Sequence, residues 1–469
     1  MTKIQPYRVN MSITEKLLVG LACLWILMAS LAPDISVAGP FKIRPEDIVS
    51  VILAGLLLFP IILSGRIRRT VIGLPFSVML AGFAFGCIGL FAILVTFMSG
   101  INLPSEGTFG HSLQLEILKE SVRFIKYAVV ALAFANVPFR AWKPVLFTLA
   151  FCCAVVVGIQ ILQYLGVGSL SEWVKETYKI NQLPNWSSRG AEISGTWRSG
   201  SVMVQPNVMG AYLILPQLLF LMLFFQSYTS FSHNKKQNRI LWLFLGSIVF
   251  AGIFMTQSHT AMFAMLFGAL LGFLYIPRKA RRKLYPNIIL IVIVIVLMGT
   301  MFGSSMSKFT PKQIVRNVNS SLGKKIHLTS VATEKLGLKI IVGSGPSNGL
   351  FVDNELGYII TWYGVAGLAV YCMFYWTLYL FAVRRIKNIY VRAAFIGTIA
   401  SYIIGAFSNS FLLCNRVFPV FIALLALACN ETISDRQRKS VNNRYPLRDV
   451  SNKPGLIGKE HNFPVRANS

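Results

Sequence analysis

Charged residues are scarce in this chain, and acidic residues are the scarcest of them. Only 13% of the 469 residues are charged, and 17 acidic residues stand against 45 lysines and arginines. Soluble domains are usually about 25% charged, because their surfaces face water. The composition therefore excludes a soluble globular enzyme, and the net charge of +28 needs an explanation of its own.

Cysteine is also sparse, and its pattern excludes two kinds of site. The seven cysteines lie in or at the ends of apolar segments, and none forms a CxxC pair. Buried, small hydrophobic side chains are their expected role. We therefore predict neither a disulfide framework nor a zinc site. The external loops hold no DxD-type carboxylate motif, so we predict no metal or other cofactor there. The cysteines are Cys23, Cys87, Cys152, Cys153, Cys372, Cys414 and Cys429.

Long apolar runs are what the chain has in abundance. Hydrophobic residues make up 55% of the sequence, and many runs approach the roughly 20 residues that cross a bilayer core. The pattern predicts an all-α polytopic membrane protein, with residues 1–430 as a single integral membrane domain of about 12 transmembrane helices. The predicted spans cover about residues 16–32, 46–63, 71–98, 121–136, 144–165, 201–226, 240–255, 260–276, 287–304, 356–382, 393–413 and 417–430.

The basic residues predict the orientation of these spans. With the N-terminus in the cytoplasm, every cytoplasmic connection carries lysine or arginine, and these pieces hold more than half of the 45 basic residues. Both termini are then cytoplasmic. The basic residues thus mainly mark the cytoplasmic side of the membrane, and they also attract anionic lipid. We predict no nucleic-acid partner. Residues 431–469, polar and rich in Pro and Asn, are predicted to form a cytoplasmic, disordered tail.

The longest predicted external loop, residues 305–355, lies between the ninth and tenth spans. Its lysines and arginines outnumber its acidic residues. The stretch "TPKQIVRNVNSSLG" offers Thr310 as an N-cap and Pro311 at the first helical position. The stretch "SVATEKLGLKII" predicts a second helix. A basic, helical loop over the outer face of the membrane suits a substrate with an anionic group.

Polar residues gather at the predicted outer ends of five spans. Ionisable groups near membrane depth are costly unless they face a cavity or a partner, so their convergence favours a functional site. Simpler roles stay open: basic side chains at span ends often snorkel to the interface, Asn354 could be only an N-cap, and His259 could cap a turn. The residues are Arg123 and Lys126; Arg198, Gln205, Pro206 and Asn207; His259; Asp353, Asn354 and Glu355; and Arg416.

Three of these segments carry a resemblance to a known family. They read "RSGSVMVQPNVMGAYLILP", "FMTQSHTAMFAMLFGALLGF" and "IIVGSGPSNGLFVDNELGYIITWYGVAGL". In order and topology they resemble the superfamily of O-antigen ligases and O-antigen polymerases, which build bacterial surface polysaccharides. The family pattern ends in a Gly-x-Gly turn, a His-Asn or Asp-Asn pair and a span with Gly-x-x-Gly. Here that part is filled by Gly343, Gly345, Asp353, Asn354, Gly364 and Gly367, and the direct match covers roughly 190–375.

The chain departs from the family pattern at two positions. Ser258-His259 stands where the family's turn commonly reads Ser-Arg, and Asp353-Asn354 stands where the ligases carry His-Asn. The second departure looks more like the polymerases. The resemblance implies an inverting, metal-independent glycosyltransferase at the outer face of the cytoplasmic (inner) membrane. Its donor would be an oligosaccharide on undecaprenyl diphosphate, and its expected protein partners are a flippase and a chain-length regulator for O-antigen, capsule or exopolysaccharide.

The resemblance and the expected chemistry together suggest roles for these residues. A diphosphate leaving group gathers negative charge, which arginine and lysine stabilise without a metal. The acceptor hydroxyl needs a base, for which Asp353 is the first candidate and Glu355 the alternative. Trp197 could stack on a sugar or belong to the interfacial aromatic belt. We assign catalysis to Asp353, Asn354, Glu355 and His259, and diphosphate or sugar binding to Arg198, Arg123, Arg316, Arg416, Asn207 and Trp197.

Two other functions stay open on the sequence alone. An O-antigen ligase would use a lipid A core as acceptor in place of another repeat unit. A transporter, such as a flippase for lipid-linked oligosaccharide, also suits twelve spans. Transporters, however, usually place ionisable groups or broken helices near the bilayer midplane and show internal repeats. Here the mid-span regions are nearly free of charge, which favours the polymerase.

Overall fold

The computed structural model covers most of the predicted membrane segments. It describes residues 12–33, 35–38, 41–64, 73–98, 113–165, 167, 169–178, 201–203, 205–229, 235–285, 323, 327, 329–331, 333–334, 336–345, 354–407, 412 and 416–430. The predicted span at 287–304, much of the 305–355 loop and the 431–469 tail lie outside these residues.

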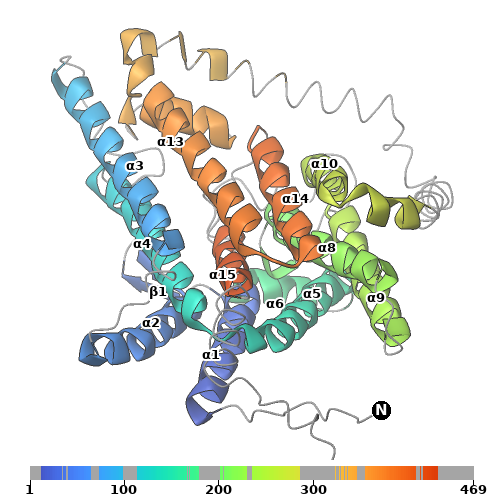
Figure 1. Cartoon of the computed structure of the whole chain (residues 1–469). Coiled ribbons are helices and arrows are strands. Elements are labelled where there is room, and N and C mark those ends of the chain that lie inside the picture. Colours follow the sequence, from blue (N-terminus) through green and yellow to red (C-terminus); the bar gives the residue numbers. More distant parts are fainter. Residues whose placement is uncertain are drawn as a thin grey trace, which may run out of the picture.

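The described chain is helical apart from one short antiparallel ribbon (Figure 1). The ribbon pairs β1 (Ile35–Ala38) with β2 (Phe41–Ile43). The helices are α1 (Ile13–Leu31), α2 (Pro45–Ser64), α3 (Gly73–Met98), α4 (Leu113–Asn136), η1 (Phe139–Ala141), α5 (Trp142–Tyr164), α6 (Leu170–Thr177), η3 (Ser201–Met203), α8 (Pro206–Thr229), α9 (Lys235–Met255), α10 (His259–Tyr275), η5 (Gly337–Ile341), α13 (Glu355–Arg385), α14 (Ile389–Gly405) and α15 (Phe418–Cys429).

Side-chain caps explain where several of these helices begin. The Ser12 hydroxyl accepts from the Glu15 N–H at 3.1 Å, and the Glu15 carboxylate accepts from the Ser12 N–H at 3.2 Å. This reciprocal pair is a capping box, which satisfies two backbone donors at the start of α1. Asn388 caps α14 by accepting from the N–H groups of Tyr390 and Val391.

Six of the described helices are long and apolar enough to cross a membrane. They are Ile13–Leu31, Gly73–Thr96, Phe139–Gln163, Pro206–Tyr228, Asn238–Met255 and Glu355–Arg385. Three shorter apolar helices, α10, α14 and α15, accompany them. The protein is therefore a helical membrane protein, as the sequence predicts.

Helix α8 is the most enclosed of the six. Its apolar window is 89% buried, whereas the windows of the other five are 50% buried or less. It contacts α9, α10 and α14, while α3 and α4 lie side by side at one edge of the bundle (Figure 1). Helices α10 and α14 pack closely where the Ser401 hydroxyl donates to the Ala264 carbonyl at 2.8 Å, as small residues at membrane-helix interfaces permit.

Helix α13 is interrupted at Gly364, where φ is 64° and ψ is −163°. The Tyr371 hydroxyl donates to the Glu355 carboxylate at 2.7 Å, although the two residues are sixteen positions apart. In an unbroken helix they would be about 24 Å apart along the axis. The segment 355–363 must therefore fold back against the segment that follows Gly364. Only 365–385, about 31 Å long, has the length of a full span, so the predicted single span at 356–382 is two helical arms.

The connection between α14 and α15 also differs from the predicted layout. Helix α14 ends at Gly405 and not near residue 413, and α15 has only 12 residues. A helix of that length rises about 18 Å, which is less than the thickness of a bilayer core. Non-helical backbone at membrane depth is tolerated where protein encloses it. Leu412, Arg416 and Val417, the described residues between position 408 and the start of α15, are accordingly buried.

Candidate functional site

The candidate site lies at the outer end of the bundle, defined here as the end where α1 and α14 finish and α8, α10, α13 and α15 begin. The name follows the orientation predicted from the basic residues. Four connections meet at this end, and each carries at least one residue that the sequence singles out. Hydrogen bonds between the connections give the site its shape.

A glycine turn docks onto the interruption in α13. The Ser344 N–H and hydroxyl both donate to the Thr361 carbonyl, at 2.9 and 3.0 Å. The break at Gly364 removes the helical partner of that carbonyl, so Ser344 replaces a lost backbone bond. The Thr96 hydroxyl of α3 in turn donates to the Ser344 carbonyl at 3.3 Å. The Gly-x-Gly turn and the Gly-x-x-Gly segment of the family pattern are thus in direct contact.

Asn354 and Glu355 open the first arm of α13. The Asn354 side chain is the N-cap and accepts from the Gly357 N–H at 2.6 Å. Its amide nitrogen donates to the Thr329 hydroxyl at 3.3 Å, which ties the cap to a residue 25 positions earlier in the chain. Glu355 follows at the first helical position, where a carboxylate is favoured by the helix dipole.

The Glu355 carboxylate is fully buried and bonded at both oxygens. One oxygen accepts from the Tyr371 hydroxyl and the other from the Leu412 N–H, each at 2.7 Å. The Leu412 carbonyl accepts from the Tyr127 hydroxyl of α4 at 2.8 Å. Glu355 therefore fixes the connection between α14 and α15. These contacts favour a positioning role for Glu355; its assignment as alternative base stays a prediction.

Arg416 joins three segments at the start of α15. Its guanidinium donates to the carbonyls of Val202, at 2.8 Å, and Ala32, at 3.1 Å. It also lies 5.5 Å from the ring centre of Tyr178, within the range of a cation–π contact. Burial raises the pKa of Tyr178 above its usual value, and the positive charge of Arg416 offsets part of that rise. Arg416 is thus a buried cation placed among the outer ends of α1, η3 and α6.

Asn207 and His259 lie on neighbouring elements. His259 is the first residue of α10, after the N-cap Ser258, whose hydroxyl accepts from the Ala261 N–H at 3.3 Å. A Cβ on Gly210 would come within 3.6 Å of the Ser258 Cβ, so the first turn of α8 faces this cap. The side chains of Asn207 and His259 are both half-buried. The side chain that caps α10 is thus that of Ser258 and not that of His259.

Arg123 and Lys126 lie on α4 near a cluster of charges. Lys126 pairs with Asp47 at 2.5 Å and with Glu46 at 3.6 Å, both at the start of α2. The half-buried Arg123 is four residues before Tyr127 and so shares its face of α4. Since Tyr127 bonds the Leu412 carbonyl, Arg123 belongs to the same neighbourhood as Glu355.

Four of the predicted site residues lie outside the described residues. Among the others, Glu355 bonds Leu412 and Arg416 bonds η3 just ahead of Asn207, while Gly210 of the same helix as Asn207 faces the cap of α10. The four outside are Trp197, Arg198, Arg316 and Asp353. Within the described residues, no group of three or more His, Cys, Asp and Glu side chains could hold a metal ion.

Sequence reasoning missed the polar partners that hold this site together. Tyr127, Tyr178, Ser344, Thr361 and Tyr371 all donate or accept in it. Tyr371 lies well inside a predicted span, and the interruption at Gly364 brings it to Glu355. Gly364 and Gly367 were the available sign of an interruption, because the hydropathy pattern itself does not reveal a break in this helix.

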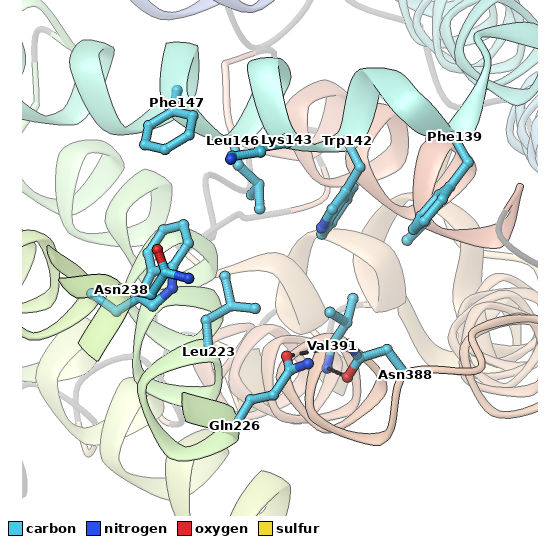
Figure 2. Close-up of a pocket in the computed structure, with 12 residues that line it drawn as sticks. Phe139, Trp142, Lys143, Leu146, Phe147, Leu223, Gln226, Asn238, Asn388 and Val391 are labelled. Carbon is cyan, nitrogen blue, oxygen red and sulfur yellow. Dashed lines mark hydrogen bonds between the residues drawn. The ribbon is translucent and has the colours of Figure 1, made fainter. Parts of the chain in front are cut away.

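A separate cavity lies at the opposite end of the bundle. It has a volume of about 400 Å³ and is lined by residues from η1, α5, α8, α9, α14 and α15 (Figure 2). None of its lining residues is a predicted site residue, so it is distinct from the outer site.

Comparison of the chain with models of known protein families and with curated proteins gives no match. The family resemblance therefore rests on the three segments quoted above, and the function rests on the site.

The contacts of Glu355 predict contrasting effects of two substitutions. We expect Glu355→Gln to keep near-normal stability, because its amide can accept from the Leu412 N–H and face the Tyr371 hydroxyl. Glu355→Leu should lower the free energy of unfolding by about 1–3 kcal/mol for each buried group left unpaired. Yield and melting temperature of the detergent-purified protein measure both effects. If the protein has the glycosyltransferase activity expected from its sequence, loss of that activity in a stable Gln variant would favour Glu355 as the catalytic base.

Proposed function

We propose that the protein is a polymerase that joins undecaprenyl-diphosphate-linked oligosaccharide repeat units at the outer face of the cytoplasmic membrane. The product would be an O-antigen, capsule or exopolysaccharide chain. In this proposal the chain has about twelve spans, both termini are cytoplasmic, and the 305–355 loop is external. The acceptor hydroxyl of one lipid-linked unit attacks the anomeric carbon of another, and the diphosphate leaves with its bonding electrons.

One observation supports the proposal most. Hydrogen bonds join α4, α13 and Leu412 of the α14–α15 connection at one end of an apolar bundle, and Arg416 before α15 separately bonds η3 at the same end. Burying such groups is costly unless they serve structure or function. A network at a membrane face suits a lipid-linked substrate, whose sugar lies outside while its tail stays in the bilayer.

Roles within the site follow from its chemistry. Asp353, next to the N-cap Asn354, takes the acceptor proton, and Glu355 positions the α14–α15 connection. Cationic side chains stabilise the charge on the departing diphosphate. We propose Arg198 for that role, with Arg123, Arg316, Arg416 and His259 as helpers, and Asn207 and Trp197 for contacts to the sugar.

The interrupted helix favours a transporter as the second candidate function. Transporters often bind their substrates at discontinuous helices, and α13 breaks at Gly364 close to a buried carboxylate. The Thr361 carbonyl at this break is already bonded by the Ser344 turn of the same chain, so a bound ion or substrate is not its partner. The polymerase is therefore the better-supported function.

Deletion of the gene from its host separates the three candidates. Loss of a polymerase should leave surface glycolipid that carries a single repeat unit. Loss of a ligase should leave long chains on undecaprenyl diphosphate and none on lipid A core. Loss of a flippase should trap single units on the cytoplasmic side. Only the first pattern agrees with the proposal, and the other two would reassign the function.

The proposed topology predicts which loops are labelled from outside the cell. On a cysteine-free background, a cysteine at Lys325 should react with an impermeant maleimide in intact cells, and one at Arg281 should react only after lysis. The basis is the concentration of basic residues in 277–286. Labelling at 281 but not at 325 in intact cells would reverse the orientation.

A further inference from the structure

The cavity at the end opposite the candidate site has its own chemistry. Under the predicted orientation it opens at the cytoplasmic side of the membrane. Figure 2 shows side chains of η1 and α5 along one side and those of α8 and α14 along the other. Its lining residues are Phe139, Trp142, Lys143, Leu146, Phe147, Leu223, Gln226, Asn238, Trp242, Asn388, Val391 and Ala428.

Aromatic rings form much of the cavity wall. Phe139 stacks on Trp142 and Phe147 stacks on Trp242, each with ring centres 6.3 Å apart. The Lys143 ammonium lies 5.9 Å from the centre of the Phe147 ring, which keeps it beside the cavity. Tryptophan rings next to a lysine are typical of the level where lipid headgroups begin.

Oriented amides supply the polar part of the lining. The Asn388 amide nitrogen donates to the Gln226 carbonyl oxygen at 3.2 Å, while the Asn388 oxygen caps α14. The two side chains are therefore held in fixed orientations between α8 and α14. Asn238 adds a third amide from α9. Amide N–H groups are suitable donors to phosphate or glycerol oxygens.

The charge around the cavity is of one sign. None of the described residues that line it is acidic, and Lys143 is exposed. Arg140, Arg239 and Lys387 are each within one to three residues of a lining residue along the chain. The Arg239 guanidinium lies 3.7 Å from the ring centre of Tyr228. Tyr228 is near the C-terminal end of α8, which is the end that borders the cavity. Basic pockets between membrane helices on the cytoplasmic side suit anionic headgroups.

We propose that this cavity binds the headgroup of an anionic phospholipid from the cytoplasmic leaflet. The phosphate would lie near Lys143, with the glycerol against the amides. The first carbons of an acyl chain would pack against the apolar lining of Leu146, Leu223 and Val391. That apolar lining favours a lipid over a free phosphate, because a small soluble anion gains nothing from contact with apolar side chains and loses its hydration there.

Lipid-dependent thermal stabilisation of the detergent-purified protein tests this binding. We expect short-chain phosphatidylglycerol to raise the melting temperature more than phosphatidylcholine does. Lys143→Gln should weaken the apparent affinity for phosphatidylglycerol about fivefold, the effect of one basic residue near an anionic surface. Lys143→Arg should keep most of it. Lys279→Gln is the matched control, since Lys279 is exposed in the basic stretch after α10 and does not line the cavity.

Three results would overturn the proposal. Equal stabilisation by the anionic and zwitterionic lipids would remove the headgroup preference. Equal weakening in Lys279→Gln would show a general charge effect and not a site. Equal stabilisation by glycerol 3-phosphate, without an acyl chain, would reassign the cavity to a soluble phosphate compound. None of these outcomes depends on whether the protein forms polymer.

Discussion

Replacement of Asp353 by asparagine should reduce polymer formation by about 10²- to 10⁴-fold, the usual contribution of a general base. The substitution keeps the size of the side chain and removes its basic oxygen. A capping role would not explain such a loss, because the N-cap position of α13 is filled by Asn354. Polymer length and amount in cells lacking the native gene measure the effect.

Protein level must stay normal for this result to bear on catalysis. Glu334→Gln is the matched control, because Glu334 is an exposed carboxylate in the same loop and its loss changes the charge equally. We expect that variant to polymerise normally. Normal chain growth in Asp353→Asn would reject Asp353 as the base and move the assignment to His259 or Glu355.

Replacement of Gly343 by alanine should lower the stability of the protein strongly. The residue has a φ of 79°, which side chains other than glycine rarely adopt. A Cβ there would come within 2.5 Å of the Tyr363 backbone nitrogen, and backbone cannot move aside cheaply. Strain and overpacking together should lower the free energy of unfolding by about 2–5 kcal/mol.

Melting temperature and membrane yield measure this loss, and Gly158 provides the control. A Cβ on Gly158, in the middle of α5, would meet no heavy atom within 4 Å. Alanine at that helical position should therefore be neutral or slightly stabilising. Equal behaviour of the two variants would mean that the glycine turn does not dock on α13 as described.

Much of the helical layout could be predicted from the sequence, for a simple physical reason. Backbone polar groups in a bilayer must be satisfied within the segment, so a long apolar run is almost always a helix. The predicted spans at 71–98, 144–165 and 240–255 accordingly lie within a few residues of α3, α5 and α9. The ribbon at 35–43 was not predicted, because its two strands are too short to show a period.

The interruption of α13 could not be predicted from hydropathy. Apolar residues lie on both sides of Gly364, and the break involves a turn some twenty residues earlier in the chain. Gly364 lies so close to the backbone at Ile341 and Gly343 that a Cβ there would come within 2.5 Å of it, and this approach exists only in three dimensions. For the same reason the sequence marked Glu355 as a possible base without showing that Tyr371 and Leu412 bond its carboxylate.

The grouping of polar residues at one end of the bundle is the part of the site that local sequence could indicate. Polar residues at span ends are visible without a structure, and those that the structure describes gather at one end of the bundle. Their individual roles depend on contacts between residues that are up to several hundred positions apart in the sequence, such as Arg416 and Ala32. Spacing in a sequence cannot supply such distances.

The most direct measurement combines the purified, reconstituted protein with undecaprenyl-diphosphate-linked repeat units isolated from the same host. The products are separated by size, with Asp353→Asn as the inactive control. We predict a ladder of lipid-linked chains that lengthens with time and needs no lipid A core. A substrate that remains a single repeat unit, in a preparation whose melting behaviour shows folded protein, would contradict the assignment as a polymerase.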